Sequence, residues 1–199
     1  MNYLSNKEGL LRAGTFFQES YGKKPSIFTK NTVIEPKQAE LYVNKEITVG
    51  GGSINLLAAS TDNEVGVTNF DGNKLEEGRA FAIDGISFDV TKGAKNTQPY
   101  NVDFKKALTS EQMIAFQFAN LIMKQKNEII FTLPIISILK GSENIEDPYR
   151  DLDLVLIEPK TQVKIEIEFP DGVVPATLES GEAIFVSVLL RGYETYQKR

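Results

Sequence analysis

Two stretches near the C-terminus alternate apolar and polar side chains with a period of two, and this pattern constrains the fold more than any other feature. The apolar side of residues 163–169 consists of Val163, Ile165, Ile167 and Phe169. Charged residues stand between them, and the same rhythm returns over residues 184–191. A period of two is typical of strands that place one face on a core. We therefore predict an all-β fold, built as an antiparallel β-sandwich.

Three residue types that carry much of protein chemistry, His, Cys and Trp, are absent from the chain. Without Cys the chain forms no disulfide and offers no thiolate nucleophile or ligand. Without His it lacks the commonest general base and the commonest transition-metal ligand. We therefore predict that the protein is not an enzyme and that it holds no cofactor and no metal.

The length of 199 residues suits one domain with a substantial core. We divide the chain into an N-terminal arm, residues 1–25, and a single sandwich domain, residues 26–199. The arm is too apolar for a pure linker, so we expect it to dock on its own domain or on another subunit. No apolar run reaches the roughly 18 residues of a spanning helix, and the N-terminus lacks the apolar segment of a secretory signal. We expect no membrane association.

The net charge of −5 argues against nucleic-acid binding by the body of the protein. The charge is uneven, because residues 1–30 carry five basic and two acidic side chains. Such an arm can contact a polyanion or a neighbouring copy, whereas an ordinary solvated terminus explains the same composition. Direct nucleic-acid binding is therefore expected, if at all, only through the N-terminal arm.

Further strand-like runs precede the two C-terminal ones, and because the run after Gly50-Gly51-Gly52 continues the strand before it, the expected total is eight or nine strands. They lie at residues 27–29, 41–43, 47–49, 53–57, 81–90, 119–125, 128–133 and 152–157. The run 81–90 contains a slip in phase, because Phe81 and Ile83 share one face whereas the apolar residues from Ile86 onward are offset by one. One extra residue at Asp84-Gly85 restores a common face. We therefore predict a β-bulge there.

Residues 109–124 fit two interpretations. Their apolar residues follow the spacing of a single amphipathic helix. Alternatively, a short helix near residues 110–114 precedes a hairpin of two strands, 119–125 and 128–133. We favour the second interpretation, because two neighbouring apolar runs separated by a polar pair are typical of a hairpin. Pro134 then lies at a strand end, where no ladder donor is needed.

Segments rich in glycine or aspartate are predicted to be turns. Gly50-Gly51-Gly52 lacks the spacing and the lysine of a phosphate-binding loop, which leaves a turn or bulge as its expected role. Asp71-Gly72 is typical of a tight hairpin, because Gly tolerates a positive φ. Calcium binding by such carboxylates is the alternative, although the ligand order of an EF-hand is absent.

No set of residues predicts catalysis. Glu158, Glu166 and Glu168 are the nearest approach to the paired carboxylates of a glycosidase, but a charged, solvated strand face explains Glu166 and Glu168. Ser180 has no His to activate it. Exposed tyrosines can bind sugars or a second subunit, and four are expected in loops or beyond the last strand: Tyr100, Tyr149, Tyr193 and Tyr196.

The C-terminal half also has a recognisable order of segments. Leu133-Pro134-Ile135 is followed by an acidic loop, by Leu156-Ile157-Glu158-Pro159, by the long strand 163–169, and by a last strand that ends in Leu190-Arg191-Gly192. This order, over residues 80–192, resembles that of jelly-roll capsid proteins of bacterial viruses, in which a proline turn precedes a long strand and the last strand ends in Leu-x-Gly. The resemblance implies a single jelly roll of about eight strands with a short helix and an N-terminal arm. It implies no catalytic or cofactor residues.

Two functions are compatible with these features. The first is a virion structural protein, either a capsid shell subunit or a protein that decorates or cements the shell, assembled in the host cytoplasm with copies of itself or other virion proteins. The alternative is a carbohydrate- or surface-binding β-sandwich module of the adhesin or fibre type. Under the first hypothesis the candidate intersubunit contacts are Leu10, Leu11, Phe16, Phe17, Tyr193 and Tyr196.

Overall fold

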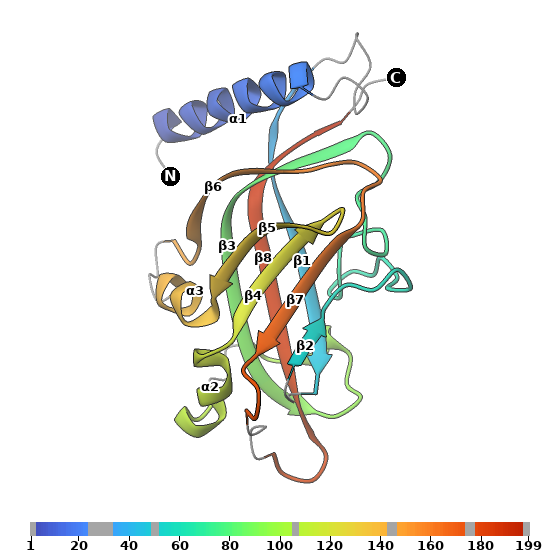
Figure 1. Cartoon of the computed structure of the whole chain (residues 1–199), viewed down its shortest axis with the longest axis vertical. Helices are drawn as coiled ribbons and strands as arrows, with labels where there is room; N and C mark the ends of the chain where they lie inside the picture. The colour runs from blue at the N-terminus through green and yellow to red at the C-terminus, as the bar shows by residue number, and fades with distance from the viewer. Residues whose placement is uncertain are drawn as a thin grey trace.

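The computed structural model describes residues 3–23, 34–48, 52–104, 108–142, 147–173 and 178–196, and the elements below are those of this part of the chain. Eight strands form two antiparallel sheets of four that lie face to face (Figure 1). The first sheet contains, in spatial order, β1 (Lys37–Ile47), β8 (Glu182–Tyr196), β3 (Arg79–Ala94) and β6 (Arg150–Ile157). The second contains β2 (Gly52–Asn55), β7 (Val163–Phe169), β4 (Asn120–Gln125) and β5 (Glu128–Pro134). The predicted antiparallel β-sandwich is confirmed.

The strand pairs are nested along the chain. The first strand pairs with the last, β2 with β7, β3 with β6, and β4 with β5, all antiparallel. Two further ladders, β3 with β8 and β4 with β7, join these pairs into the two sheets. The chain therefore runs as one long antiparallel ribbon that is folded over to bury one of its faces.

The period-two pattern correctly predicts which side chains face the core. The four apolar residues of β7 are at most 2% exposed and join the main hydrophobic cluster. The inner residues of β8 behave in the same way. Phe185 lies on the outer face of β8, but it is 0% exposed and is therefore not in contact with solvent. Residues near Val102 cover it, since a Cβ at Gly93 would meet both Phe185 and Val102 at 3.1 to 3.3 Å.

The predicted bulge at Asp84-Gly85 is confirmed. The register of β3 shifts between Ile83 and Gly85 in both of its ladders, so Asp84 is the extra residue. Beyond it the apolar residues of β3 return to the core side, and Ile83 and Ile86 are both fully buried. The bulge therefore does what the sequence pattern requires, because a ladder without it would expose half of the strand's apolar residues.

The second interpretation of residues 109–124 is also confirmed. A short helix, α2 (Ser110–Gln117), precedes the β4–β5 hairpin, and Pro134 is the last residue of the edge strand β5. Lys126 and Asn127 have φ of 54° and 66°, the positive values that a two-residue turn between twisted strands requires.

Two further helices were not expected from the sequence. Residues 3–23 of the arm form α1 (Tyr3–Lys23), and α3 (Ile135–Ser142) follows β5. Ile135 and Ile138 lie one helical turn apart and are fully buried in the main core, so α3 packs into the sandwich beside β3 and β6. The sequence does not distinguish α3 from a strand, because its apolar residues directly follow those of β5.

The edge of β1 is covered by the loop that follows β2. Asn44 N donates to Val67 O at 2.7 Å, and Tyr42 N donates to the Asn69 side-chain oxygen at 2.9 Å. Edge donors satisfied in this way do not recruit a foreign strand. In the same loop, paired backbone bonds between Asp71 and Lys74, with a Gly72 φ of 62°, confirm the predicted tight turn.

Three sequence expectations concern residues outside or at the margin of the described chain. The strand at 27–29 lies outside the described residues, as do Gly50 and Gly51 of the glycine triplet. The strand predicted at residues 183–191 is longer than expected. It runs from Glu182 to Tyr196 because β3 supplies partners back to Arg79, so Tyr193 and Tyr196 lie within β8 and not beyond it.

Candidate functional site

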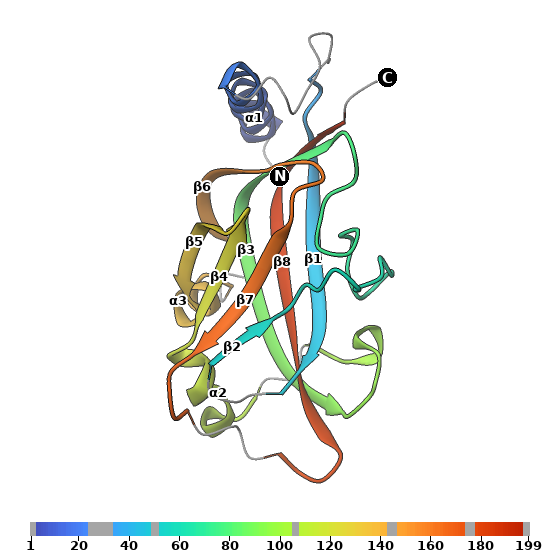
Figure 2. The same ribbon diagram turned by 45° about the vertical axis from the view of Figure 1, so that its right-hand side comes forward.

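The six candidate contact residues lie at one end of the sandwich, and four of them, Leu10, Phe16, Phe17 and Tyr193, share one hydrophobic cluster. Four of the six are on α1, which crosses this end of the molecule above β3 and β8 (Figures 1 and 2). The other two are among the last four residues of β8. Residues from opposite ends of the sequence are thereby brought together.

Helix α1 forms because its residues suit a helix and because one of its faces is apolar. No proline interrupts residues 3–23, and Gly9, Ala13 and Phe17 recur every four residues along one side. A helix of this length is marginal in isolation and needs tertiary packing to be stable. Ala13 and Phe17 supply that packing, since both are 0% exposed.

The surface beneath α1, which we call the α1 seat, belongs to the outer face of the first sheet. It consists of Ala80, Ala82, Leu154, Leu156 and Tyr193. Small side chains on β3 leave room for the ring of Phe17. The Tyr193 hydroxyl lies against the backbone of Gly9, where a Cβ would be only 2.1 Å from the oxygen. Gly9 therefore leaves the space that the Tyr193 hydroxyl occupies, and a larger side chain at residue 9 would take up that space.

The six residues divide into buried and accessible groups. Phe17 and Tyr193 are 0% and 5% exposed against their own chain, and Leu10 and Phe16 are half-buried around them. Leu11 is 65% exposed and Tyr196 is 45% exposed. The arm thus docks on its own domain, one of the two alternatives expected from the sequence. Leu11 remains an accessible apolar group on α1, whereas Tyr196 lies beneath the guanidinium of Arg79 on the opposite face of β8 from Tyr193.

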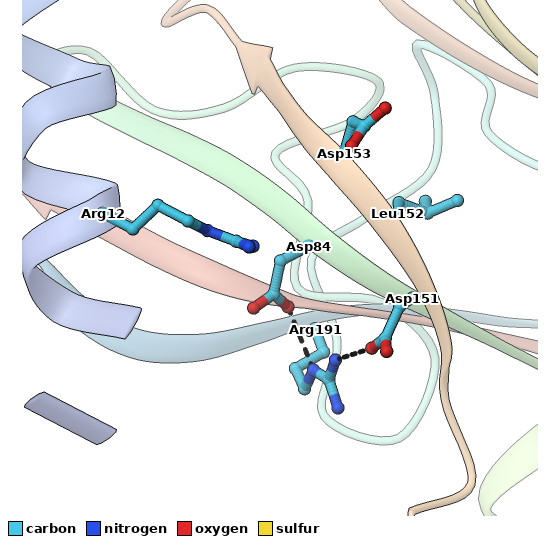
Figure 3. A pocket seen from close by; sticks show the side chains of 6 residues that line it. All are labelled: Arg12, Asp84, Asp151, Leu152, Asp153 and Arg191. Atoms are coloured by element: carbon cyan, nitrogen blue, oxygen red, sulfur yellow. Dashed lines mark hydrogen bonds and ion pairs between the residues drawn. The ribbon is translucent and has the colours of Figure 1, made fainter. Parts of the chain in front are cut away.

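Next to the α1 seat, Arg191 of β8 organises a cluster of charges that the sequence analysis did not predict (Figure 3). Its guanidinium donates to Asp84 Oδ1 at 3.0 Å, to Asp147 Oδ2 at 2.9 Å and to Asp151 Oδ1 at 2.7 Å. Burial alone would lower the pKa of Arg191, but the bonds to these three carboxylates hold that pKa above its ordinary value. Arg191 is thus permanently charged, and it ties β8 to the bulge of β3 and to β6.

The bulge is what allows this arrangement. It turns Asp84 toward Arg191 and places Gly85 opposite it in the ladder. A Cβ at Gly85 would be 2.9 Å from Arg191 Nη2, so glycine leaves the space in which the guanidinium lies across the strand. The phase slip at Asp84-Gly85 is visible in the sequence, but it does not identify Arg191 as the partner of Asp84, because the two residues are 107 positions apart.

Tyr149 extends the cluster to the edge of the sheet. Arg191 stacks over its ring at 4.9 Å, and the Tyr149 hydroxyl donates to Glu40 Oε1 of β1 at 2.6 Å. Burial and the neighbouring Glu40 carboxylate raise the pKa of Tyr149, so its hydroxyl stays a proton donor at neutral pH. Together these contacts join residues of all four strands of the first sheet.

A cavity of about 520 Å³ opens between α1 and β6. Arg12, Asp84, Asp151, Leu152, Asp153 and Arg191 line it, and Arg12 projects from α1 toward Asp84 (Figure 3). The lining is charged apart from Leu152, and two of its carboxylates, Asp84 and Asp151, are paired with Arg191. Among the described residues, no group of three or more carboxylates is placed to hold a metal ion.

The carboxylates considered for glycoside hydrolysis have structural partners. Glu166, on the outer face of β7, pairs with Lys124 of β4 at 2.5 Å. Glu158 is 2% exposed and binds the ammonium group of Lys126. Glu168 and Ser180 are exposed. The predicted solvated face of β7 is therefore correct for Glu168 only, since the Glu166 side chain is 14% exposed, and Glu158 is a buried partner of the β4–β5 turn.

Comparison with protein-family models and with curated proteins finds no match to this chain. Within the described residues, no helix has the length and apolar character needed to span a membrane.

Proposed function

We propose that the sandwich is a single jelly roll and that the protein is a virion structural protein, a capsid shell subunit or a shell-decorating protein that acts by self-association. The observation that carries this proposal is the nested strand pairing, first with eighth through fourth with fifth. An antiparallel ribbon folded over in this way is the architecture of a jelly roll, which viral capsid domains use. A fold alone does not define a function, so the contact surface must support the same conclusion.

The surface at α1 and the end of β8 supports self-association. It presents Leu11, a large apolar group that a monomer leaves in water. The Arg191 cluster next to the α1 seat links the four strands of the first sheet, and such links reduce the entropy that the surface loses when a second copy binds. Symmetric assemblies repeat one such contact many times, which makes even a modest contact sufficient.

The test is light scattering after size exclusion across a concentration series. The expected result is growth from the 22.2 kDa chain into defined oligomers, followed by shells or capsomers in electron micrographs. Replacing Leu11 by Ser should raise the concentration needed for association roughly fivefold to tenfold, the effect of losing one buried apolar side chain. The Val65→Ser variant is the matched control, because Val65 is 87% exposed in the loop beside β1.

A strict monomer at the highest concentration would contradict the proposal. The carbohydrate- or surface-binding module would then be the better hypothesis, and a glycan-binding screen would be the next experiment. Lectin domains also use the jelly roll, so that outcome would leave the proposed fold intact while removing the virion function.

A further inference from the structure

We propose that the α1 seat also accepts α1 from a second copy, so that two chains exchange their N-terminal helices. This inference rests on the proposed function, because it specifies the contact through which copies associate. The occupant is defined by the structure itself, since a surface that fits its own α1 fits the α1 of an identical chain equally well.

The helix can leave its seat without opening the main core. Ala13 and Phe17 belong to a separate cluster with Ala80, Ala82 and Tyr193, on the outer face of the first sheet. The main cluster, between the two sheets, contains no residue of α1. Apolar packing joins α1 to the seat, and Arg12 of α1 lines the adjoining cavity together with Asp84 and Asp151. Undocking α1 therefore exposes one apolar patch and leaves the sandwich intact.

The connection to β1 is long enough for exchange. Thirteen residues separate Lys23, the last residue of α1, from Lys37, the first residue of β1. A chain of that length spans at most about 46 Å when extended. The helix itself is about 32 Å long, so the connection can carry α1 beyond its own seat to that of a neighbour.

The contacts of α1 also leave apolar surface unused. Leu11 is 65% exposed and Phe16 is only half-buried when α1 lies on its own seat. In an exchanged pair the seat contacts are the same as in the monomer, and the two chains additionally lie close enough to cover such residues. This added burial favours the exchanged form as the protein concentration rises.

Complementation between two full-length variants tests the exchange. Gly9→Leu spoils the helix, because its side chain meets the Tyr193 hydroxyl, but leaves the seat intact. Ala82→Trp blocks the seat at a position that is 0% exposed beneath α1, but leaves the helix intact. Each variant alone has no matching pair of helix and seat. Mixing them creates one matching pair, between the helix of the second variant and the seat of the first.

The expected result is a 1:1 heterodimer in the mixture, at twice the mass of the 22.2 kDa chain and at least tenfold more abundant than any dimer of either variant alone. Circular dichroism of each variant confirms that it is folded. If the mixture stays monomeric while the wild-type chain self-associates, exchange is wrong and the proposed function stands. If the wild-type chain does not associate, the proposed function fails on that measurement, independently of the mixture.

A second measurement does not depend on the Ala82→Trp variant. A fluorescent peptide of residues 1–23 should bind the vacant seat of the full-length Gly9→Leu protein, as measured by anisotropy. The same peptide with Gly9→Leu should bind at least tenfold more weakly. A peptide with Gln18→Ala, changed at an exposed position of α1, should bind as the wild-type peptide does. Equal binding of the Gly9→Leu and wild-type peptides would overturn the inference.

Discussion

Replacing Gly192 by Ala should strongly destabilise the sandwich, because an added Cβ has less room here than at any other glycine among the described residues. A Cβ at Gly192 would lie 2.0 Å from the carbonyl oxygen of Ala82 and 2.8 Å from Cε1 of Phe81. Ordinary contact begins at 3.4 Å, so backbone and side chain must separate by roughly 1.4 Å. The neighbouring atom is backbone, and no flexible side chain can move aside to make room.

The size of the effect follows from these contacts. Overpacking a well-packed interior costs about 1–3 kcal/mol, and each ladder hydrogen bond weakened by the opening costs about 0.5–1.5 kcal/mol more. We expect Gly192→Ala to lower the free energy of unfolding by about 3 kcal/mol. For a chain of this size that corresponds to a fall in Tm of roughly 6–12 °C.

Urea denaturation followed by circular dichroism, at one protein concentration for all variants, measures this change. Gly22→Ala is the matched control, because Gly22 is an exposed helical residue with nothing within 4 Å of an added Cβ. That variant should be unchanged or more stable by about 0.5 kcal/mol. A Gly192→Ala protein within 1 kcal/mol of wild type would refute the reasoning, since the strands would then tolerate a side chain at this position.

Three further predictions concern charge, pH and turn geometry. Arg191→Met should lower the free energy of unfolding by about 2–4 kcal/mol in the same assay, because it removes the cation that pairs with Asp84, whose side chain is 13% exposed. Arg191→Lys should recover only part of this loss. Burial raises the pKa of Asp89 above its ordinary 3.8, so its charge opposes folding at neutral pH and this penalty disappears as pH falls below 3.8. Asp89→Asn should therefore be more stable than wild type at pH 7 but not at pH 3, as denaturation at the two pH values will show. Asn127→Gly should match or exceed wild-type stability by a few tenths of a kcal/mol, because Asn127 has φ of 66°, and a loss above 1 kcal/mol would contradict the assigned turn.

Much of the local architecture was predictable from the sequence, because local pairing rules leave their pattern in neighbouring residues. Alternation over 163–169 predicted which side of β7 is buried, and the phase slip at Asp84-Gly85 predicted the bulge. The β4–β5 hairpin followed from two apolar runs around a polar pair. Helix α3 was missed because a short apolar run after a strand fits either period.

The candidate site was only partly predictable for the same reason. Apolar residues near the two termini indicated contact surfaces, but their spacing does not tell which of them their own chain buries. Phe17 and Tyr193 meet in one cluster although they are far apart in the sequence. The Arg191 cluster is harder still, because Asp84 comes from β3, whereas Asp147 and Asp151 come from a second, distant segment at the start of β6.

The amino-acid sequence by itself therefore determined the class of fold, the inward face of the principal strands and the position of the bulge. Each of these depends on interactions between residues a few positions apart, whose periodicity is visible in one dimension. Only the tertiary structure decided the nested order of the strands, the docking of α1 on its seat and the gathering of three carboxylates around Arg191. Those features depend on which distant segments share a surface. That choice is made by the burial of the whole ribbon against itself, which no local pattern records.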